Sequence, residues 1–265
     1  MFHMLENIGI FDSHAHYEDK KFDEDREELL ASMSSFGVKK IVNVGSDLLT
    51  SVKSVELANR YDFVYAAVGV HPEECGGMTE NELVAIRNLA AKEKVVAIGE
   101  IGLDYYWPEP EHEIQKIWFE KQLFMAGELG MPVIIHSRDA AKDTMDIIKK
   151  HYENLPERRG VIHCYSGSAE MAQEYVNMGF FIGVGGVVTF KNSNKLKGVV
   201  EKIDISNILI ETDCPYMAPV PNRGKRNDSS MLIYVADMIA QIKGMTKEDV
   251  IRITHENALR MYGLS

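Results

Sequence analysis

The chain alternates between short apolar runs and longer amphipathic stretches, and it does so eight times. Within each apolar run the hydrophobic residues are continuous and do not alternate with polar ones, as is typical of parallel strands buried on both faces. This pattern predicts eight strands, at residues 8–16, 39–45, 63–71, 94–104, 132–139, 160–167, 180–187 and 207–215.

The stretches between these runs carry apolar residues at three- and four-residue spacing, which predicts amphipathic helices. Segments such as DREELLASMSSF and DAAKDTMDIIKKHY show the spacing clearly. Start and stop signals flank several of them. We predict N-caps at Asp47, at Thr79 with Glu82 in a capping box, and at Asp139, and C-caps at Gly37, Gly130 and Gly179.

Successive strand ends lie 23 to 36 residues apart, which is room for one strand and one helix each. Eight regular βα units favour a (β/α)₈ TIM barrel over a doubly wound sheet, which uses fewer strands. No Pro-, Gly- or Ser-rich linker divides the 265 residues. We therefore predict a single-domain (β/α)₈ barrel over residues 1–265, with helices near 230–241 and 247–261 completing the outer ring.

Side chains able to bind a metal stand at the carboxyl ends of the predicted strands. In a barrel these ends meet at one mouth, where barrel enzymes place their chemistry. A lone histidine there is more often a structural hydrogen-bonding residue, but convergence of this many ligands favours a metal site. The two histidines of the HAH motif face the same side of a strand and would grip one ion together. The residues concerned are His14, His16, His71, Glu100, His136, His163 and Asp213.

Two carboxylates are the predicted catalytic residues. Glu100 lies within an apolar run, where an unpaired carboxylate would cost several kcal/mol, and a central carboxylate can bridge two ions. The structural alternative for Glu100 is an ion pair with a cation such as Arg138. Asp213 ends the last strand, where it could bind an ion and accept a proton from an attacking water, or simply close a turn.

Charge and cysteine content narrow the class of protein. A net charge of −11 argues against a long basic groove for nucleic acid, although the loop NRGKR, residues 222–226, is locally cationic. Three scattered cysteines and no apolar span predict a cytoplasmic protein without disulfides or a membrane segment. Cys164 and Cys214 adjoin His163 and Asp213, so strand alternation predicts that both point away from the mouth into the core.

Seven motifs together resemble the TatD family of metal-dependent deoxyribonucleases, and they cover almost the whole chain. They are FDSHAH, VGVHPEE, GEIGLDYY, VIIHSRDA, HCYSGS, ETDCPYMAP and RGKRN. The resemblance implies one or two divalent ions, such as zinc, manganese or magnesium. It also implies exonuclease-type phosphodiester hydrolysis of DNA at single strands or ends. By position, His14, His16, Glu100 and Asp213 match the ligands of the first metal, and Glu100, His136 and His163 those of the second.

One loop departs from the family pattern. After RGKRN similar proteins continue with Glu-Pro, whereas this chain reads Asp228-Ser229-Ser230, and either serine could serve as the N-cap of the next helix. The glycines of GVGG, residues 183–186, could cradle a phosphate or simply make room for packing. We expect substrate phosphate contacts from His71, Arg138, Arg223 and Lys225.

Two other functions stay open at this point. A barrel of this kind could hydrolyse a small amide, ester or lactone, although such enzymes often bridge their metals with a modified lysine, and Lys94 stands at the wrong end of its strand. A non-catalytic metal- or nucleotide-binding barrel is the second alternative, and the full set of ligands argues against it. Nothing in the sequence indicates a protein partner.

Overall fold

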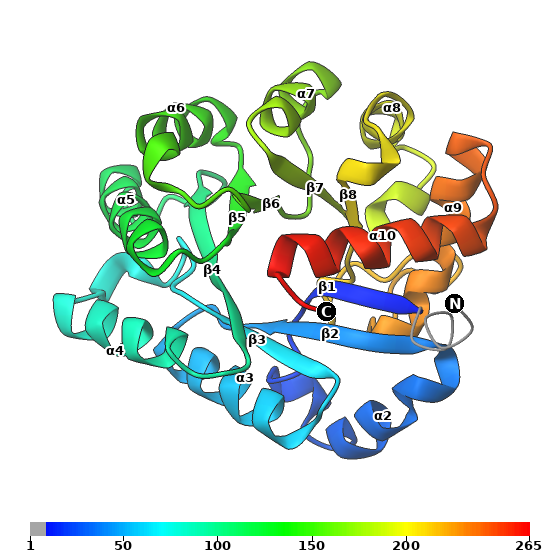
Figure 1. The fold of residues 1–265 in the computed structure, drawn as a ribbon, viewed down its shortest axis with the longest axis horizontal. Coiled ribbons are helices and arrows are strands. Elements are labelled where there is room, and N and C mark those ends of the chain that lie inside the picture. Colours follow the sequence, from blue (N-terminus) through cyan, green and yellow to red (C-terminus); the bar gives the residue numbers. More distant parts are fainter. Residues whose placement is uncertain (1–8) are drawn as a thin grey trace.

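The computed structural model describes residues 9–265 and contains the eight expected strands (Figure 1). All neighbouring strands pair in parallel, in the order β1 to β8 along one sheet. Residue 8, where the first predicted strand begins, lies outside the described residues. The strands are β1 Ile10–Ala15, β2 Val38–Val44, β3 Val64–Val68, β4 Val95–Asp104, β5 Val133–Arg138, β6 Gly160–Ile162, β7 Phe180–Val184 and β8 Ile208–Ile210.

Helices follow the strands and form the outer layer. The α-helices are α2 Arg26–Ser32, α3 Leu48–Arg60, α4 Glu80–Ala90, α5 His112–Leu129, α6 Ala141–His151, α7 Ala169–Asn177, α8 Asn194–Lys202, α9 Leu232–Lys243 and α10 Lys247–Tyr262. Short 3₁₀ helices are η1 Lys20–Phe22, η2 Met33–Phe36, η3 Cys75–Gly77, η4 Tyr152–Asn154, η5 Gly186–Thr189, η6 Ile205–Asn207 and η7 Ser229–Met231. Among residues 9–265, none of these helices is long and apolar enough to cross a membrane.

Most predicted caps are present. Asp47 and Thr79 each form a capping box, and Gly37 and Gly130 end their helices in the left-handed conformation. Gly179 has φ +86° one residue beyond the C-cap of α7. The prediction for Asp139 was wrong, because Ala140 is the N-cap of α6 and Asp139 itself has φ +53°.

Two apolar layers hold the barrel together. One lies between the strands and the outer helices, and the other fills the barrel interior. Residues Ala258, Met261 and Tyr262 at the end of α10 pack into the inner layer beside Phe11. Helix α10 therefore closes the barrel at the amino ends of the strands, as Figure 1 shows, and leaves the carboxyl ends open for a site.

The seam between β8 and β1 closes beyond the last residue of β8. The Asp213 amide donates to His14 O at 2.9 Å, and the His16 amide donates to Cys214 O at 2.9 Å. Burial raises the pKa of the Asp12 carboxyl to about 7. Its oxygens bridge the seam by accepting Thr212 N at 3.0 Å and Ser229 Oγ at 2.6 Å.

The seam also explains the serines that replace Glu-Pro. Ser229 is buried and bonds Asp12, and Asp228 rather than either serine caps η7 by accepting the Ser230 amide. Neither serine is the N-cap of α9, which is Met231. The predicted N-cap was therefore wrong, because the adjacent acidic residue takes that role and Ser229 is drawn inward by the buried carboxylate.

A pairing irregularity in β1 brings both histidines of the HAH motif inward. Phe11 packs in the inner layer, so strict alternation would point His14 outward. The β1–β2 register shifts between Asp12 and Ala15, and Ala15 packs in the outer layer. The shift changes the phase of the strand, so that His14 and His16 both face the mouth.

Candidate metal centre

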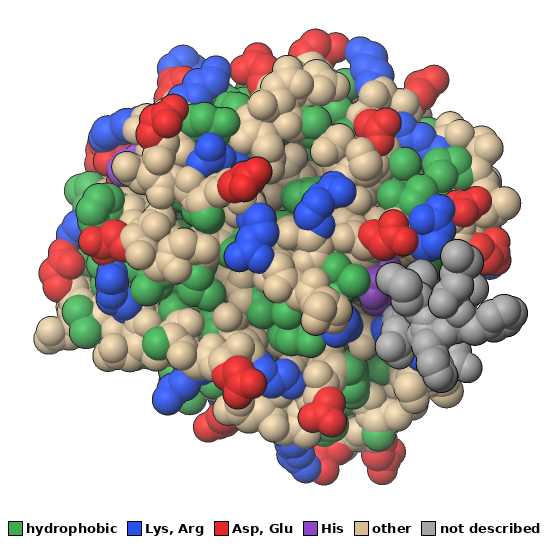
Figure 2. Space-filling model, viewed as in Figure 1, with side chains coloured by type: hydrophobic (Ala, Val, Ile, Leu, Met, Phe, Trp, Pro, Cys, Tyr) green, Lys and Arg blue, Asp and Glu red, His purple; other side chains and the backbone are tan. Residues whose placement is uncertain are grey.

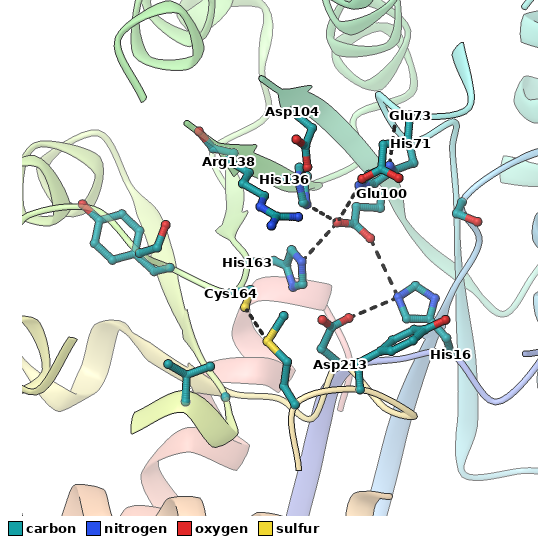
Figure 3. A pocket seen from close by; sticks show the side chains of 18 of the residues that line it. His16, His71, Glu73, Glu100, Asp104, His136, Arg138, His163, Cys164 and Asp213 are labelled. Atoms are coloured by element: carbon teal, nitrogen blue, oxygen red, sulfur yellow. Dashed lines mark hydrogen bonds and ion pairs between the residues drawn. The ribbon is translucent and has the colours of Figure 1, made fainter. Parts of the chain in front are cut away.

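A cavity of about 930 Å³ opens where the carboxyl ends of the strands meet. Figure 3 shows the predicted site residues gathered at its floor, around the carboxylate of Glu100. Glu100 extends from β4 into this cavity and its residue is only 4% exposed. No ion pair with Arg138 forms among residues 9–265. The cations that Glu100 does contact are histidines, and these are the predicted metal ligands themselves.

The two oxygens of Glu100 serve two groups of ligands. Its Oε1 lies 2.8 Å from His136 Nδ1 and 3.1 Å from His163 Nε2. Its Oε2 lies 3.3 Å from His14 Nε2 and 3.8 Å from His16 Nε2. One carboxylate thus joins the end of β1 to the ends of β5 and β6, which is the placement expected of a bridging ligand.

Asp213 completes the group at the end of β1. Its Oδ1 lies 3.4 Å from His16 Nε2 and 3.9 Å from His14 Nε2, and those two nitrogens are 3.0 Å apart. The residue has φ +55°, so the chain turns sharply there after the short strand β8. That turn returns the carboxylate to the mouth although it stands three residues beyond Ile210.

Acceptor atoms on the side of His16 and of His136 away from the cavity fix which ring nitrogen carries the proton. The other nitrogen of each ring, which faces the cavity, then has the lone pair when the ring is neutral. His16 Nδ1 donates to Val44 O at 2.8 Å, and His136 Nε2 donates to Asp104 Oδ2 at 2.9 Å. A neutral imidazole carries one proton, so the inward nitrogens, His16 Nε2 and His136 Nδ1, are free to bind a cation. Hydrogen bonds of this kind usually orient metal-binding histidines.

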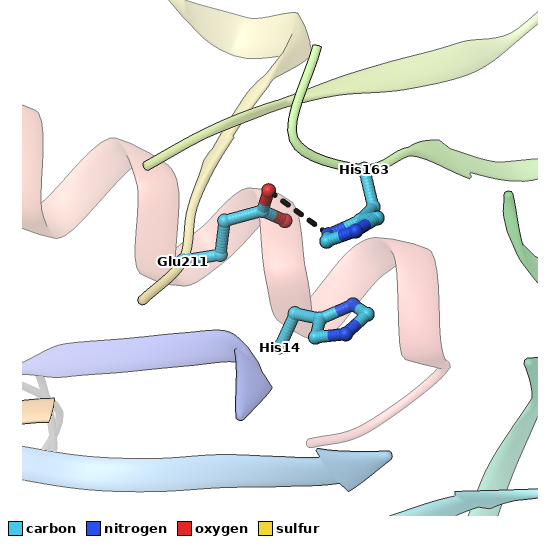
Figure 4. Close-up of side chains that lie close together, drawn as sticks. All are labelled: His14, His163 and Glu211. Atoms are coloured by element: carbon cyan, nitrogen blue, oxygen red, sulfur yellow. Dashed lines mark ion pairs between the residues drawn. The ribbon is translucent and has the colours of Figure 1, made fainter. Parts of the chain in front are cut away.

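The Glu211 carboxylate lies behind His163, and the strand pattern of the sequence did not predict it. Glu211 is fully buried, and its Oε1 accepts the Cys164 amide at 2.5 Å and lies 3.2 Å from His163 Nδ1. Figure 4 shows this pair beside His14, whose ring stacks on that of His163 with centroids 3.8 Å apart. The contact directs His163 Nε2 toward Glu100.

His71 has the opposite arrangement. Its Nδ1 accepts the backbone N–H of Glu73 at 3.2 Å, so in the neutral ring Nε2 carries the proton. Burial, and then the positive charge of His136, lower the pKa of His71 to about 3, which keeps the ring neutral. Its Nε2, 3.6 Å from Glu100 Oε1, is therefore a hydrogen-bond donor at the cavity floor rather than a free ligand.

The other charges at the site are tightly coupled. Burial raises the pKa of Glu100 but the surrounding histidines outweigh it, so this pKa lies well below its usual value. For Asp213, burial is likewise outweighed, first by the hydrogen bond with His16, and its pKa is lowered. Burial lowers the pKa of His136, yet hydrogen bonds to Asp104 and Glu100 raise it to about 9.

This donor set fits divalent ions. The inward nitrogen of His16 faces another imidazole nitrogen and carboxylate oxygens, so lone pairs point at lone pairs unless a cation or added protons lie between them. Three groups of side chains have possible ligand atoms within 4.8 Å of one another: His14, His16 and Asp213; His71, Glu100 and His136; and His14, His163 and Glu211. Imidazole and carboxylate together suit zinc, manganese and related ions.

The expected phosphate-contact residues separate into two groups. His71 and Arg138 line the cavity, and Arg138 also packs over the Tyr106 ring at 3.7 Å. Arg223 and Lys225 are not among the lining residues. The Arg223 guanidinium lies 4.4 Å from the Phe190 ring centre, and Lys225 Nζ contacts Asn222 Oδ1 at 3.4 Å. Arg226 of the same loop pairs with Asp25, which ties the loop to the outside of the mouth.

The two cysteines behave differently from one another. Cys214 is fully buried, as predicted. The prediction for Cys164 was wrong, because this residue lines the cavity, with Sγ 3.6 Å from Met217 Sδ. β6 ends at Ile162 and Cys164 has φ +43°, so strand alternation no longer applies at this position. Burial raises the pKa of the Cys164 thiol well above its usual value, which argues against a thiolate nucleophile.

The GVGG segment makes room for Glu211. A Cβ added at Gly183 would lie 2.5 Å from Glu211 Oε2, and one at Gly186 would lie 2.1 Å from Met217 O. These contacts support close packing of the segment rather than a phosphate cradle.

Several site residues were not found from the sequence. Glu18, Asp104 and Glu211 approach the histidines from behind, and Lys20, Lys53 and Lys195 line the cavity. Glu18, Asp104 and Glu211 stand two to four residues from a predicted ligand in FDSHAHYE, GEIGLD and ETD, which is a usable signal. The lysines lie in helices and loops, where no sequence signal separates them from ordinary surface lysines.

Comparison with known proteins agrees with this geometry. A protein named uncharacterized metal-dependent hydrolase YabD, from Bacillus subtilis, is 46% identical over 256 residues, covering 97% of this chain and 100% of that protein. Another of that description, YcfH from Escherichia coli, is 34% identical over 259 residues, covering 96% and 95%. The crystal structure of YjjV, a TatD homolog from Escherichia coli, has a TM-score of 0.91 at 29% identity, covering 97% of this chain and 98% of that one.

The family model described as TatD related DNase matches residues 11–263, which include every residue of the three groups. The relatives match over their whole length, and the fold agrees strand for strand with the expected barrel. The chain therefore belongs to the TatD-related DNase family.

Proposed function

We propose that this chain is a divalent-metal-dependent hydrolase that cleaves phosphodiester bonds in DNA, acting as an exonuclease on single strands or ends. The observation that carries the proposal is the shared carboxylate of Glu100, whose two oxygens face two histidine groups. A pair of ions on one bridging carboxylate is a recurrent arrangement in enzymes of phosphate ester chemistry. The family description and the metal-dependent names of the relatives support the same class.

In this proposal the residues His14, His16, Glu100 and Asp213 would hold one ion, and Glu100, His136 and His163 would hold the other. A bound divalent ion lowers the pKa of water and neutralises charge that develops on phosphoryl oxygens. The Asp213 carboxylate is ionised, since its pKa is lowered, and it accepts the proton of the attacking water. A P–O bond to water forms while the bond to the leaving sugar oxygen breaks, and that oxygen takes a proton from solvent.

His71 and Arg138 are suited to the phosphate itself. The Nε2–H of His71 points into the cavity beside Glu100, and a donor held in advance at this place stabilises charge on a phosphoryl oxygen. The Arg138 guanidinium presents a fork of donors that matches phosphate geometry. Figure 3 shows Arg138 next to His136, at the side of the cavity away from His16.

Hydrolysis of a small amide, ester or lactone is the alternative function. A bridging modified lysine would be its usual sign, and Lys94 does not reach the mouth, because its Nζ binds Tyr61 O at 2.6 Å near the amino end of β4. The size of the cavity and the four Lys and Arg side chains in its lining fit a phosphodiester better.

End-labelled single-stranded DNA incubated with Mg²⁺, Mn²⁺ or Zn²⁺, beside an esterase and amidase panel, tests the proposal. We expect metal-dependent stepwise shortening of the DNA, its loss on chelation, and no shortening by Asp213→Ala. The matched control is Asp146→Ala, which removes an exposed carboxylate paired with Lys142 outside the mouth. Turnover of a carbonyl substrate without DNA cleavage would favour the alternative, and full activity of Asp213→Ala would exclude the proposed base.

A further inference from the structure

Four cationic side chains line the cavity of this acidic protein. They are Lys20 in η1, Lys53 in α3, Arg138 at the end of β5 and Lys195 in α8. The net charge of the chain is −11, so cations at one opening are not explained by overall composition. Each of the four is largely exposed to solvent.

These cations lack the ion-pair partners that several other lysines have. Among residues 9–265, none of the four forms an ion pair, whereas six lysines elsewhere do. The paired lysines include Lys121 with Glu80, Lys142 with Asp146, Lys150 with Glu120 and Lys202 with Glu170. Figure 2 likewise shows acidic and basic side chains interspersed over the face that α10 closes. Cations without a counter-ion around a cavity are suited to an anionic ligand.

The four cations lie on two sides of the metal ligands. Lys20 and Lys53 follow β1 and β2, whereas Arg138 and Lys195 accompany β5 and β7, across the barrel in strand order. The acidic residues Glu73 and Glu74, on the loop after β3, also line the cavity and interrupt the ring of cations. A ligand with charge at one point could not reach both sides, whereas a chain of phosphates could.

The cavity also contains surfaces suited to bases. Tyr216 and Met217 line it and are 45% and 42% exposed, on the loop that follows Asp213. Exposed aromatic rings beside a cationic track are the usual means of holding single-stranded nucleic acid without sequence preference. Free phosphate or a small phosphate ester would not need this apolar surface.

We propose that Lys20, Lys53 and Lys195 bind backbone phosphates that neighbour the reacting one, beside Arg138 on the reacting phosphate, so that the cavity holds several successive phosphates of one strand. This inference rests on the proposed function, and it names the recognition that the metal ligands cannot provide. It also places the phosphate contacts inside the cavity, on three lysines that no motif contains, and not on Arg223 and Lys225.

Binding of a fluorescein-labelled, phosphorothioate-linked single-stranded 12-mer, followed by anisotropy with the metal-loaded full chain from 50 to 200 mM KCl, tests the inference. The test variant carries Lys20→Gln, Lys53→Gln, Arg138→Gln and Lys195→Gln. The control carries Lys121→Gln, Lys142→Gln, Lys150→Gln and Lys202→Gln, which has the same net charge and an unaltered cavity. Lys53→Gln and Lys195→Gln alone serve as milder variants.

We expect the slope of log affinity against log salt to fall by about 0.7 for each cation removed, and by about 3 in the test variant. The control should bind with the slope of the wild type. A test variant that keeps the wild-type slope, a control that loses as much as the test variant, or a wild type that does not bind the 12-mer would each overturn the inference.

The binding and cleavage experiments distinguish failure of the cationic binding site from failure of the proposed function. If the wild type binds with a slope that the test variant loses, yet shortens no natural DNA, the proposed function fails and the cationic binding site stands. If the wild type shortens DNA and the test variant keeps the full slope, the binding site fails and the proposed function stands.

Discussion

The ends of β3 and β5 each present a histidine to the same oxygen of Glu100, and the two rings lie edge to face with centroids 4.4 Å apart. Their pKa values nevertheless move in opposite directions, to about 3 for His71 and about 9 for His136. The difference comes from the atom behind each ring. A backbone N–H stands behind His71 and the Asp104 carboxylate behind His136. The neutral His71 ring therefore presents a proton to the cavity, whereas the His136 ring presents a lone pair once its inward proton is released.

This comparison teaches that residue type and position do not by themselves make a ligand. Both histidines lie near the carboxyl end of a strand, both are mostly buried and both approach the carboxylate of Glu100. Only the hydrogen bond on the far nitrogen separates the histidine that we propose holds a cation from the one that we propose contacts substrate. Substitutions at the carboxylate that the two rings share, at the rings themselves and at the acceptor behind one ring test this difference.

The largest effect is expected from Glu100→Ala. Loss of the shared carboxylate leaves both ligand groups without their common anion and brings several imidazoles together unneutralised. We expect bound metal to fall below one ion per chain and hydrolysis to fall to background, as measured by elemental analysis and DNA shortening. Glu74→Ala, which removes a cavity-lining carboxylate away from the histidines, should retain metal. Normal metal content in Glu100→Ala would rule out the bridging role.

Replacing each ring by glutamine tests whether His71 and His136 have different roles. His136→Gln should lose affinity for metal, because an inward lone pair is removed. His71→Gln should retain metal and lower kcat by about 10²-fold, because one preset hydrogen-bond donor is displaced. Metal titration followed by kcat measurement in saturating metal separates the two effects. Equal loss of metal from both variants would show that His71 is a ligand.

Two substitutions at Asp104 test the hydrogen bond behind His136. Asp104→Ala leaves His136 Nε2 without its acceptor, and loss of such a supporting contact costs about 10- to 100-fold in metal affinity. Asp104→Asn retains an acceptor oxygen without the charge and should lose less. Competition with a chromogenic chelator measures both affinities. Asp146→Ala, at an exposed carboxylate on α6, is the control. Wild-type affinity in Asp104→Ala would contradict the positioning role.

The smallest effect is the pH dependence of metal binding. With a pKa of about 9, His136 holds a proton at neutral pH before metal binds, and binding must release it. Affinity should therefore rise with pH, by about tenfold per unit for each proton released, at least up to about pH 9. His16 and His163 add to this rise, because the carboxylates beside them outweigh burial and hold their pKa values well above the usual value. His71 contributes nothing here, since its pKa of about 3 leaves it neutral. Calorimetry in buffers of different ionisation enthalpy counts the protons, and binding without proton release would contradict the assignment.

Much of the architecture was predictable because its causes are local. Continuous apolar runs at regular spacing define buried parallel strands, and the regular distance between them defines a closed ring of βα units. Side chains at the carboxyl ends of such strands meet at one mouth whatever the details of packing. The barrel and the gathering of His14, His16, Glu100, His136, His163 and Asp213 follow from that rule.

Predictions from the sequence failed beyond the strand ends, where side chains no longer alternate between two faces. β6 and β8 are only three residues long, and beyond them Cys164 and Asp213 both have positive φ. The first was expected in the core and lines the cavity, and the second reaches the mouth through a turn instead of along a strand. The RGKR loop is cationic in sequence, but its Arg226 is neutralised by Asp25 on a distant segment.

The sequence by itself determined the barrel, the family and the ligands that converge at the mouth, because strand periodicity and strand-end position are properties of neighbouring residues. Only the tertiary structure decided which atom stands behind each histidine and which cations remain without a partner. Val44 O, Asp104 and Glu211 reach their histidines from other strands or loops. Such contacts depend on register and side-chain packing between segments far apart in the chain, for which no local pattern exists.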